Sequence, residues 1–270
     1  MSVKIEVKSC DDGAKVRRRA VAQSVLDVFG NGLPDLKLLA FFDDKDWQPF
    51  KDHWGKENRG FYRPIKEGIF QSPIWPSDAM QCIFVDDDDP SSSLPLKQDV
   101  DHVIYLHGST CAGEVGLIMT FSHELQHFIQ YGFNRKLWAE NLLLPHLPRE
   151  VIDITGLNWP DFPAEREART VAKRTGMKLC GADAVNKYID RRISESITQK
   201  EVDDWRFSQR VDPSISYDLA GETRRIFQRL KPFRQHLEEL LDQQGADADF
   251  KNLDLAEYFD DADDHAVRLG

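Results

Sequence analysis

The spacing of apolar residues changes along the chain from short strand-like runs to a helical pattern. A helix is predicted over 14–29, where apolar residues recur at helical spacing and Gly30 follows as a stop. Short apolar runs then predict strands at 36–42, near Gly68–Gln71, at 81–85 and at 102–107. From Glu114 onward the apolar positions return to helical spacing. We therefore expect an α+β fold with an N-terminal helix, a small mixed sheet and a helical C-terminal half.

Prolines and glycines divide the helical half into segments. The predicted helices are 114–131, 134–144, 164–178, 182–197 and 217–243, the last one broken or kinked at Lys231–Pro232. No clean linker separates the strands from the helices, so a single domain is predicted over 1–270. Its parts are a strand-containing half at about 1–132, a helical half at about 133–250 and an acidic tail at about 251–270.

The charge balance narrows the class of partner. The chain has 35 Lys and Arg against 46 Asp and Glu, a net charge of -11, which argues against a protein that coats nucleic acid or anionic lipid. No apolar run is long enough to span a membrane, and no secretion signal is recognised. The four widely spaced cysteines are typical of free thiols in a reducing compartment. We therefore expect a cytoplasmic protein that contacts neither nucleic acid nor membrane.

The acidic run that begins at Asp86 contains four consecutive carboxylates, which could in principle bind calcium. Residues 86–99 (DDDDPSSSLPLKQD) lack the alternating ligands and the turn glycine of an EF-hand loop. A solvated loop is predicted there instead.

One helical segment carries a pattern typical of a metal site. Residues 116–132 (GLIMTFSHELQHFIQYG) contain His123, Glu124 and His127 as HExxH. On a helix, positions i and i+4 lie on the same side, so both imidazoles can reach one metal ion. A second stripe, predicted to pack on the core, consists of Leu117, Phe121, Leu125 and Phe128. We predict that His123 and His127 bind zinc (Zn2+) and that Glu124 takes a proton from a water molecule.

A zinc site of this kind needs a third protein ligand. The metzincin pattern HExxHxxGxxH is excluded because Gln130 and Phe133 occupy its glycine and third histidine positions. His146, in a proline-flanked loop, is a weaker candidate than the segment 161–174, where Glu165-Arg166-Glu167-Ala168 begins a predicted helix.

Together these segments resemble the gluzincin-type zinc metallopeptidases, whose third ligand is a glutamate on a later helix, often in an ExxA pattern. Glu165-Arg166-Glu167-Ala168 is similar to that pattern, and the resemblance covers 116–132 and 163–172. It implies a zincin-like fold, a bound Zn2+ and a glutamate ligand on the later helix. Several such families have Asp four residues after the ligand, where this chain has Arg169.

Helix geometry favours Glu165 over Glu167 as that ligand. Glu165 shares a face with Ala168 and Ala172, whose small side chains allow close packing on the HExxH helix. Glu167 points to another side of the helix and stays the alternative ligand. Acidic residues are also common at exposed helix starts, where they need no metal.

The strand before the HExxH helix supplies candidates for a group that stabilises an oxyanion. Peptidases of the resembled type present an edge strand to the substrate backbone, and HVIYLH at 102–107 is the best match. Strand alternation puts Tyr105 and His107 on one face, so both are predicted catalytic residues, with Tyr131 as a further candidate. A packed tyrosine and an exposed histidine are the structural alternatives.

The function predicted from these residues is that of a zinc-dependent metallopeptidase that hydrolyses protein or peptide substrates. The alternative is a degenerate zincin scaffold with a structural metal that acts as a binding or regulatory protein. Glu124 argues against the alternative, because a purely structural site does not need that carboxylate. The substrate, the choice between endo- and exo-cleavage, the oligomeric state and the biological role stay open at this stage.

Overall fold

The described part of the chain is mainly helical. The computed structural model describes residues 5–7, 12–30, 33, 39–41, 60–64, 85–86, 89–93, 102–106, 113–244, 250 and 253–259. Among residues whose side chains are described, 82% are helical and 2% lie in strands. The predicted α+β fold with a mixed sheet is therefore wrong. Short apolar runs indicated strands, but a run of that kind does not specify the partners that a sheet requires.

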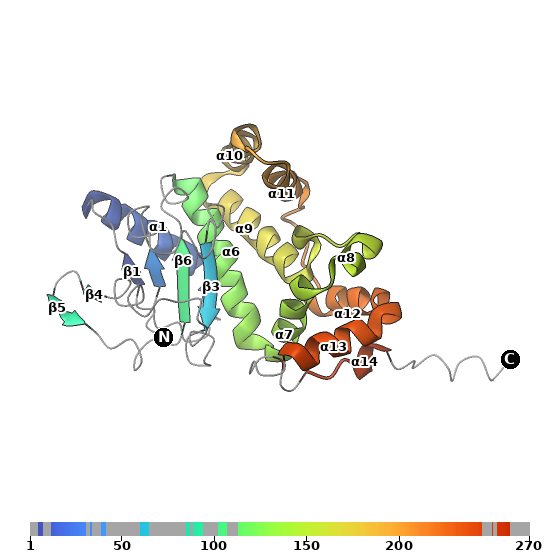
Figure 1. Cartoon of the computed structure of the whole chain (residues 1–270). Helices are drawn as coiled ribbons and strands as arrows, with labels where there is room; N and C mark the ends of the chain where they lie inside the picture. The colour runs from blue at the N-terminus through green and yellow to red at the C-terminus, as the bar shows by residue number, and fades with distance from the viewer. Residues whose placement is uncertain are drawn as a thin grey trace. The chain divides into compact units, whose positions relative to one another are not determined.

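The strands of the described residues form three hydrogen-bonded pairs. Their bounds are β1 Ile5–Val7, β2 Leu39–Phe41, β3 Gly60–Pro64, β4 Val85–Asp86, β5 Asp89–Ser93 and β6 His102–Leu106. β1 pairs with β2 in parallel, whereas β3 with β6 and β4 with β5 are antiparallel, and Figure 1 shows β3 beside β6. The strand predicted at 102–107 is found as β6, and the one predicted near Gly68–Gln71 lies outside the described residues. β5 is a correction, since a loop was predicted across it.

Most of the predicted helices are present, with ends shifted by a few residues. Their bounds are α1 Asp12–Phe29, α6 Glu114–Phe133, α7 Arg135–Leu143, α8 Arg149–Thr155, α9 Pro163–Cys180, α10 Ala182–Glu195, α11 Gln199–Arg210, α12 Leu219–Arg229, α13 Arg234–Gln244 and α14 Ala256–Phe259. Short 3-10 helices occur at Leu144–His146, Trp159–Asp161 and Lys231–Phe233. The last of these contains Pro232 and separates α12 from α13, so the break predicted at Lys231–Pro232 is confirmed.

Three helices were not predicted, namely α8, α11 and α14. α11 nevertheless has a local start signal, because Thr198 and Glu201 form a capping box. The hydroxyl of Thr198 accepts from the backbone N–H of Glu201, and the Glu201 carboxylate accepts from that of Thr198. That pattern could have been read from the sequence.

The chain divides into two compact units. Unit 1 contains Met1–Gly132 and Ala168–Ile215, and unit 2 contains Phe133–Glu167 and Ser216–Gly270. Helix α9 is continuous across the boundary between Glu167 and Ala168. The prediction of a single domain stays a prediction.

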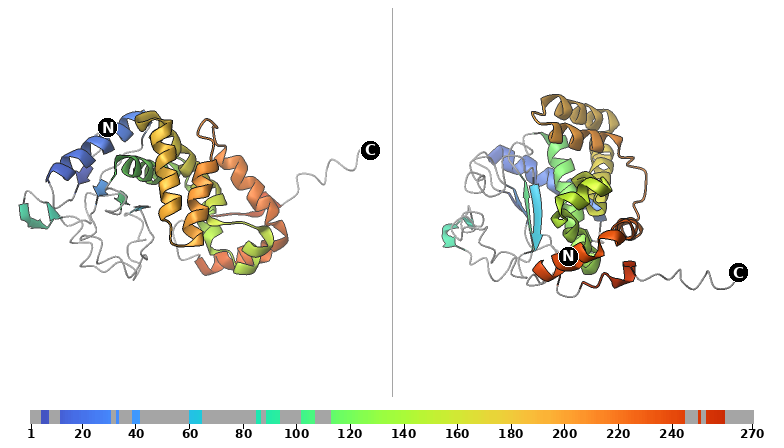
Figure 2. Two further views of the ribbon diagram at one scale, coloured as in Figure 1. Left: turned by 90° about the horizontal axis from the view of Figure 1, so that it is seen from above. Right: turned by 45° about the vertical axis from the view of Figure 1, so that its right-hand side comes forward.

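In unit 1, helices α6, α9, α10 and α11 share one apolar cluster. Its buried members are Met119, Ala172, Val185, Ile189 and Trp205. Gly176 on α9 shows how closely the helices approach, because a Cβ atom there would lie 3.1 Å from both Met119 and Val185. α10 and α11 lie side by side (Figure 2), with Tyr188 and Trp205 in edge-to-face contact.

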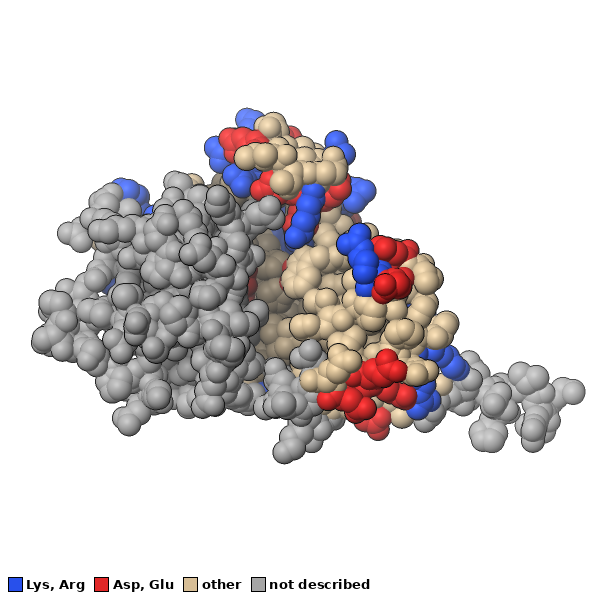
Figure 3. All heavy atoms as spheres, viewed as in Figure 1, with Lys and Arg blue, Asp and Glu red and all other residues tan. Residues whose placement is uncertain are grey.

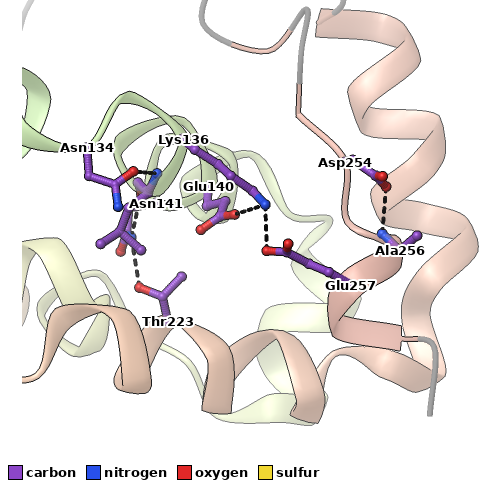
Figure 4. Close-up of polar contacts among 9 residues, drawn as sticks. Asn134, Lys136, Glu140, Asn141, Thr223, Asp254, Ala256 and Glu257 are labelled. Carbon is purple, nitrogen blue, oxygen red and sulfur yellow. Dashed lines mark hydrogen bonds and ion pairs between the residues drawn. The ribbon is translucent and has the colours of Figure 1, made fainter. Parts of the chain in front are cut away.

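In unit 2, a larger apolar cluster joins α7, α8 and α12 to the C-terminal helices. Phe227 and Leu230 are fully buried in it, and Phe250, Leu255 and Phe259 are nearly so. The first part of the predicted acidic tail therefore contributes to this core. Figure 4 shows the polar contacts beside it, where Lys136 on α7 pairs with Glu257 on α14 at 2.6 Å.

Charged side chains of both signs lie on the described part of the surface. On the face drawn in Figure 3, Lys and Arg are interspersed with Asp and Glu. Several charged residues of the described helices form pairs within one helix, such as Arg149 with Asp153 and Arg234 with Glu238. None of the described helices combines the length and the apolar character that crossing a bilayer requires.

Candidate metal centre

Helix α6 buries one side and carries the two histidines on another. Leu117, Phe121, Leu125 and Phe128 are at most 2% exposed, so the apolar stripe predicted on this helix is confirmed. Glu124 and His127 are also buried, with 6% and 8% exposed, while His123 is half-buried. The apolar stripe fixes the rotation of the helix and thereby the positions of the polar groups.

The two imidazole rings meet through the nitrogen atoms that would bind a metal ion. Nε2 of His127 lies 3.1 Å from Nε2 of His123. The ring centroids are 4.7 Å apart and the planes are nearly perpendicular, at 89°. Zinc–nitrogen bonds of about 2.05 Å at tetrahedral angles would separate two nitrogen ligands by about 3.3 Å. The observed spacing of the histidines fits one shared metal ion.

Glu165 completes a group of three possible ligands. One ligand atom from each of His123, His127 and Glu165 lies within 4.8 Å of the other two. Because a tetrahedral site requires about 3.3 Å between ligand atoms, only a small side-chain adjustment separates this group from a bound geometry. Two imidazole nitrogens and one carboxylate oxygen are a donor set typical of catalytic zinc, so the residues fit the implied ion.

The start of α9 positions Glu165. Pro163 is the first residue of the helix, a position that proline favours because it has no N–H to lose. The backbone N–H of Ala164 donates to Oδ1 of Asn141, at 3.0 Å, which satisfies one of the free donors of this helix start. Ala168 and Ala172 are buried, as expected for the face that they share with Glu165.

The other acidic and imidazole candidates are not part of this group. Glu167 is half-buried, and its negative charge acts on the Tyr217 phenol, whose pKa is raised first by burial and then by neighbouring carboxylates. His146 is exposed, and Asp161, an acidic residue shortly before α9 that could also offer a ligand oxygen, is half-buried. Among the described residues, neither joins His123 and His127 in a group of metal-ligating side chains.

Gln130 contacts His127 and was not predicted as a site residue. Its Oε1 lies 2.8 Å from Nδ1 of His127, and both side chains are buried. A sequence signal exists, because Gln130 follows His127 by three residues and side chains at that spacing on a helix are neighbours.

Arg169 binds α11 in the described structure. Its guanidinium donates to Oγ of Ser208 at 3.2 Å and pairs with Asp204 at 3.5 Å. Arg169, at the position where the resemblance to gluzincins implies an aspartate, thus contributes to packing within unit 1.

The two predicted oxyanion groups, Tyr105 and His107, are not tested by the described residues. Tyr105 pairs with Phe61 in the register of β6 and β3, but its side chain lies outside the described residues, as does all of His107. Tyr131 is buried, with 5% exposed. Tyr105 and His107 therefore stay predictions.

Comparison with known proteins identifies no relative of this chain. The chain matches no protein-family model, no curated protein and no solved structure. The assignment of a function therefore depends on the residues of the candidate metal centre.

Proposed function

We propose that this chain is a zinc-dependent metallopeptidase of gluzincin type. The observation that carries the proposal is the approach of His123, His127 and Glu165 to within 4.8 Å of one another. The buried carboxylate of Glu124 directly follows the first histidine, which is the position of the general base in the HExxH pattern. A cytosolic location is part of the proposal and is supported by the wide spacing of the cysteines.

Each residue of the centre has a defined task in this proposal. His123, His127 and Glu165 hold the ion. When bound, zinc would acidify a water molecule and polarise the carbonyl oxygen of the substrate. Glu124 accepts a proton from the attacking water and then delivers it to the leaving amine. The burial of Glu124 shields its carboxylate from bulk water during this transfer.

The proposal is tested by metal content and peptide hydrolysis measured on the same protein. Zinc-loaded wild-type protein is incubated with a mixture of peptides, and new termini are identified by mass spectrometry. Glu124→Gln is expected to keep zinc and fold but to lose cleavage, because the general base contributes about 100-fold or more to such reactions. Glu114→Gln, on the same helix but exposed, is the matched control and should cleave like wild type.

Two outcomes contradict the proposal in different ways. Cleavage by Glu124→Gln at the wild-type rate would remove the proposed mechanism. Tight zinc binding without cleavage of any peptide by the wild-type protein would favour the alternative, a scaffold with a structural metal.

A further inference from the structure

The side-chain amide of Gln130 lies against one of the proposed zinc ligands. Oε1 of Gln130 is 2.8 Å from Nδ1 of His127. Both side chains are buried, with 5% and 8% exposed, so water competes poorly for this hydrogen bond. Because the two residues lie on the same helix, α6 itself sets the distance between them.

This hydrogen bond selects one form of the imidazole ring. An amide oxygen only accepts hydrogen bonds, so Nδ1 of His127 carries the proton that it donates. A neutral ring with its proton on Nδ1 has a free lone pair on Nε2. Nε2 of His127 is the atom that faces Nε2 of His123 at 3.1 Å. The nitrogen freed by Gln130 is therefore the one in the candidate metal centre.

We propose that Gln130 is a positioning residue that holds His127 with Nε2 ready to bind zinc, an inference that rests on the proposed function. Without an acceptor at this place, a neutral imidazole can carry its proton on either nitrogen. Zinc would then have to select the competent form, which lowers the apparent affinity. Hydrogen-bond partners of metal-binding histidines contribute about 10- to 100-fold to affinity elsewhere.

The test compares three variants of the full chain. Gln130→Met removes the acceptor at similar length, and Gln130→Glu retains an acceptor for the Nδ1 proton. Gln126→Met is the matched control, because Gln126 is buried on the same helix but makes no hydrogen bond to His123 or His127 among the described residues. Zinc dissociation constants are measured by competition with a chelator.

We expect Gln130→Met to bind zinc about 10- to 100-fold more weakly than wild type. Gln130→Glu should restore wild-type affinity or exceed it, and Gln126→Met should leave it unchanged. A second readout needs no metal. Nitrogen chemical shifts of His127 in the metal-free protein should show Nδ1 protonated in wild type and a mixture of tautomers in Gln130→Met.

Wild-type affinity in Gln130→Met would overturn the inference while leaving the proposed zinc site intact. Failure of the wild-type protein to bind zinc would overturn the proposed function, and the inference with it. If Gln130→Met does not fold, the wild-type spectrum decides, because a His127 protonated on Nε2 contradicts the inference without any variant.

Discussion

At the scale of single residues, two glutamates on the first turns of α9 have different surroundings. Glu165 offers a ligand atom close to those of His123 and His127. The charge of Glu167, in contrast, helps to raise the pKa of the Tyr217 phenol. We predict that Glu165→Gln weakens zinc binding by about tenfold or more, since an amide lacks the charge that offsets the ion. Glu167→Gln should be nearly silent in the same chelator competition. The reverse order would transfer the ligand role to Glu167.

Glu140 gives a prediction for the dependence of stability on pH. Its side chain is 1% exposed, and burial raises its pKa above the ordinary value of 4.5 against the opposing effects of Tyr258 and Lys136. The folded protein therefore holds the proton more tightly than the unfolded chain does. The stabilisation from protonated Glu140 is complete below pH 4.5 and is lost as the pH rises through the raised pKa.

Urea unfolding of wild type and Glu140→Gln over a series of pH values tests the direction in which stability changes with pH. The free energy of unfolding of wild type, relative to that of the variant, should fall as the pH rises above about 4.5. A relative stability that rises with pH over the same range would contradict the assigned pKa shift.

At the scale of elements, α9 holds the end of α11 through a buried ammonium group. Nζ of Lys173 donates to the carbonyl oxygens of Gln209 and Val211, at 2.6 and 2.7 Å. Lys173 is 5% exposed, and burial lowers its pKa. These bonds satisfy the carbonyl group of Gln209, in the last turn of α11, and that of Val211, the residue that follows the helix.

Lys173→Met should lower the free energy of unfolding by about 1–3 kcal/mol, because it leaves the two carbonyl groups without their charged donor. The matched control is Arg174→Met. Arg174 also donates to two backbone carbonyls, those of Pro213 and Ile215, but it is exposed, so water can replace it. Chemical unfolding of both variants measures the difference. An equal effect of the two substitutions would show that burial does not set the strength of this contact.

At the scale of the whole molecule, bound zinc should stabilise the folded chain by mass action. At free zinc 100-fold above the dissociation constant, the gain is about 2.7 kcal/mol if the unfolded chain does not bind the ion. Thermal unfolding with zinc and with a chelator measures it. His123→Ala should lose the response, whereas His146→Ala should keep it, because His146 is exposed and outside the group of ligands. A response that survives in His123→Ala would place the bound ion elsewhere.

The sequence by itself determined features that depend on neighbours along one helix. The HExxH spacing and the apolar stripe of α6 are local, since turns of a helix bring residues i, i+3 and i+4 together whatever surrounds them. The helix break at Pro232 is also a local effect, since proline disrupts the helix in which it occurs. The preference for Glu165 over Glu167 is local as well, because it depends on which residues share one face of α9. The contact between His127 and Gln130 was equally local and could have been predicted.

Only the tertiary structure decided which distant segments meet. β1 pairs with β2 and β3 pairs with β6, whereas one mixed sheet was predicted. An apolar run in the sequence does not specify which other strand it pairs with. The partners of Arg169 on α11 and the burial of Phe259 in unit 2 depend in the same way on packing between elements remote in the chain. Local periodicity fixes the face that a residue occupies, whereas the group opposite that face is set by the free energy of packing the whole chain.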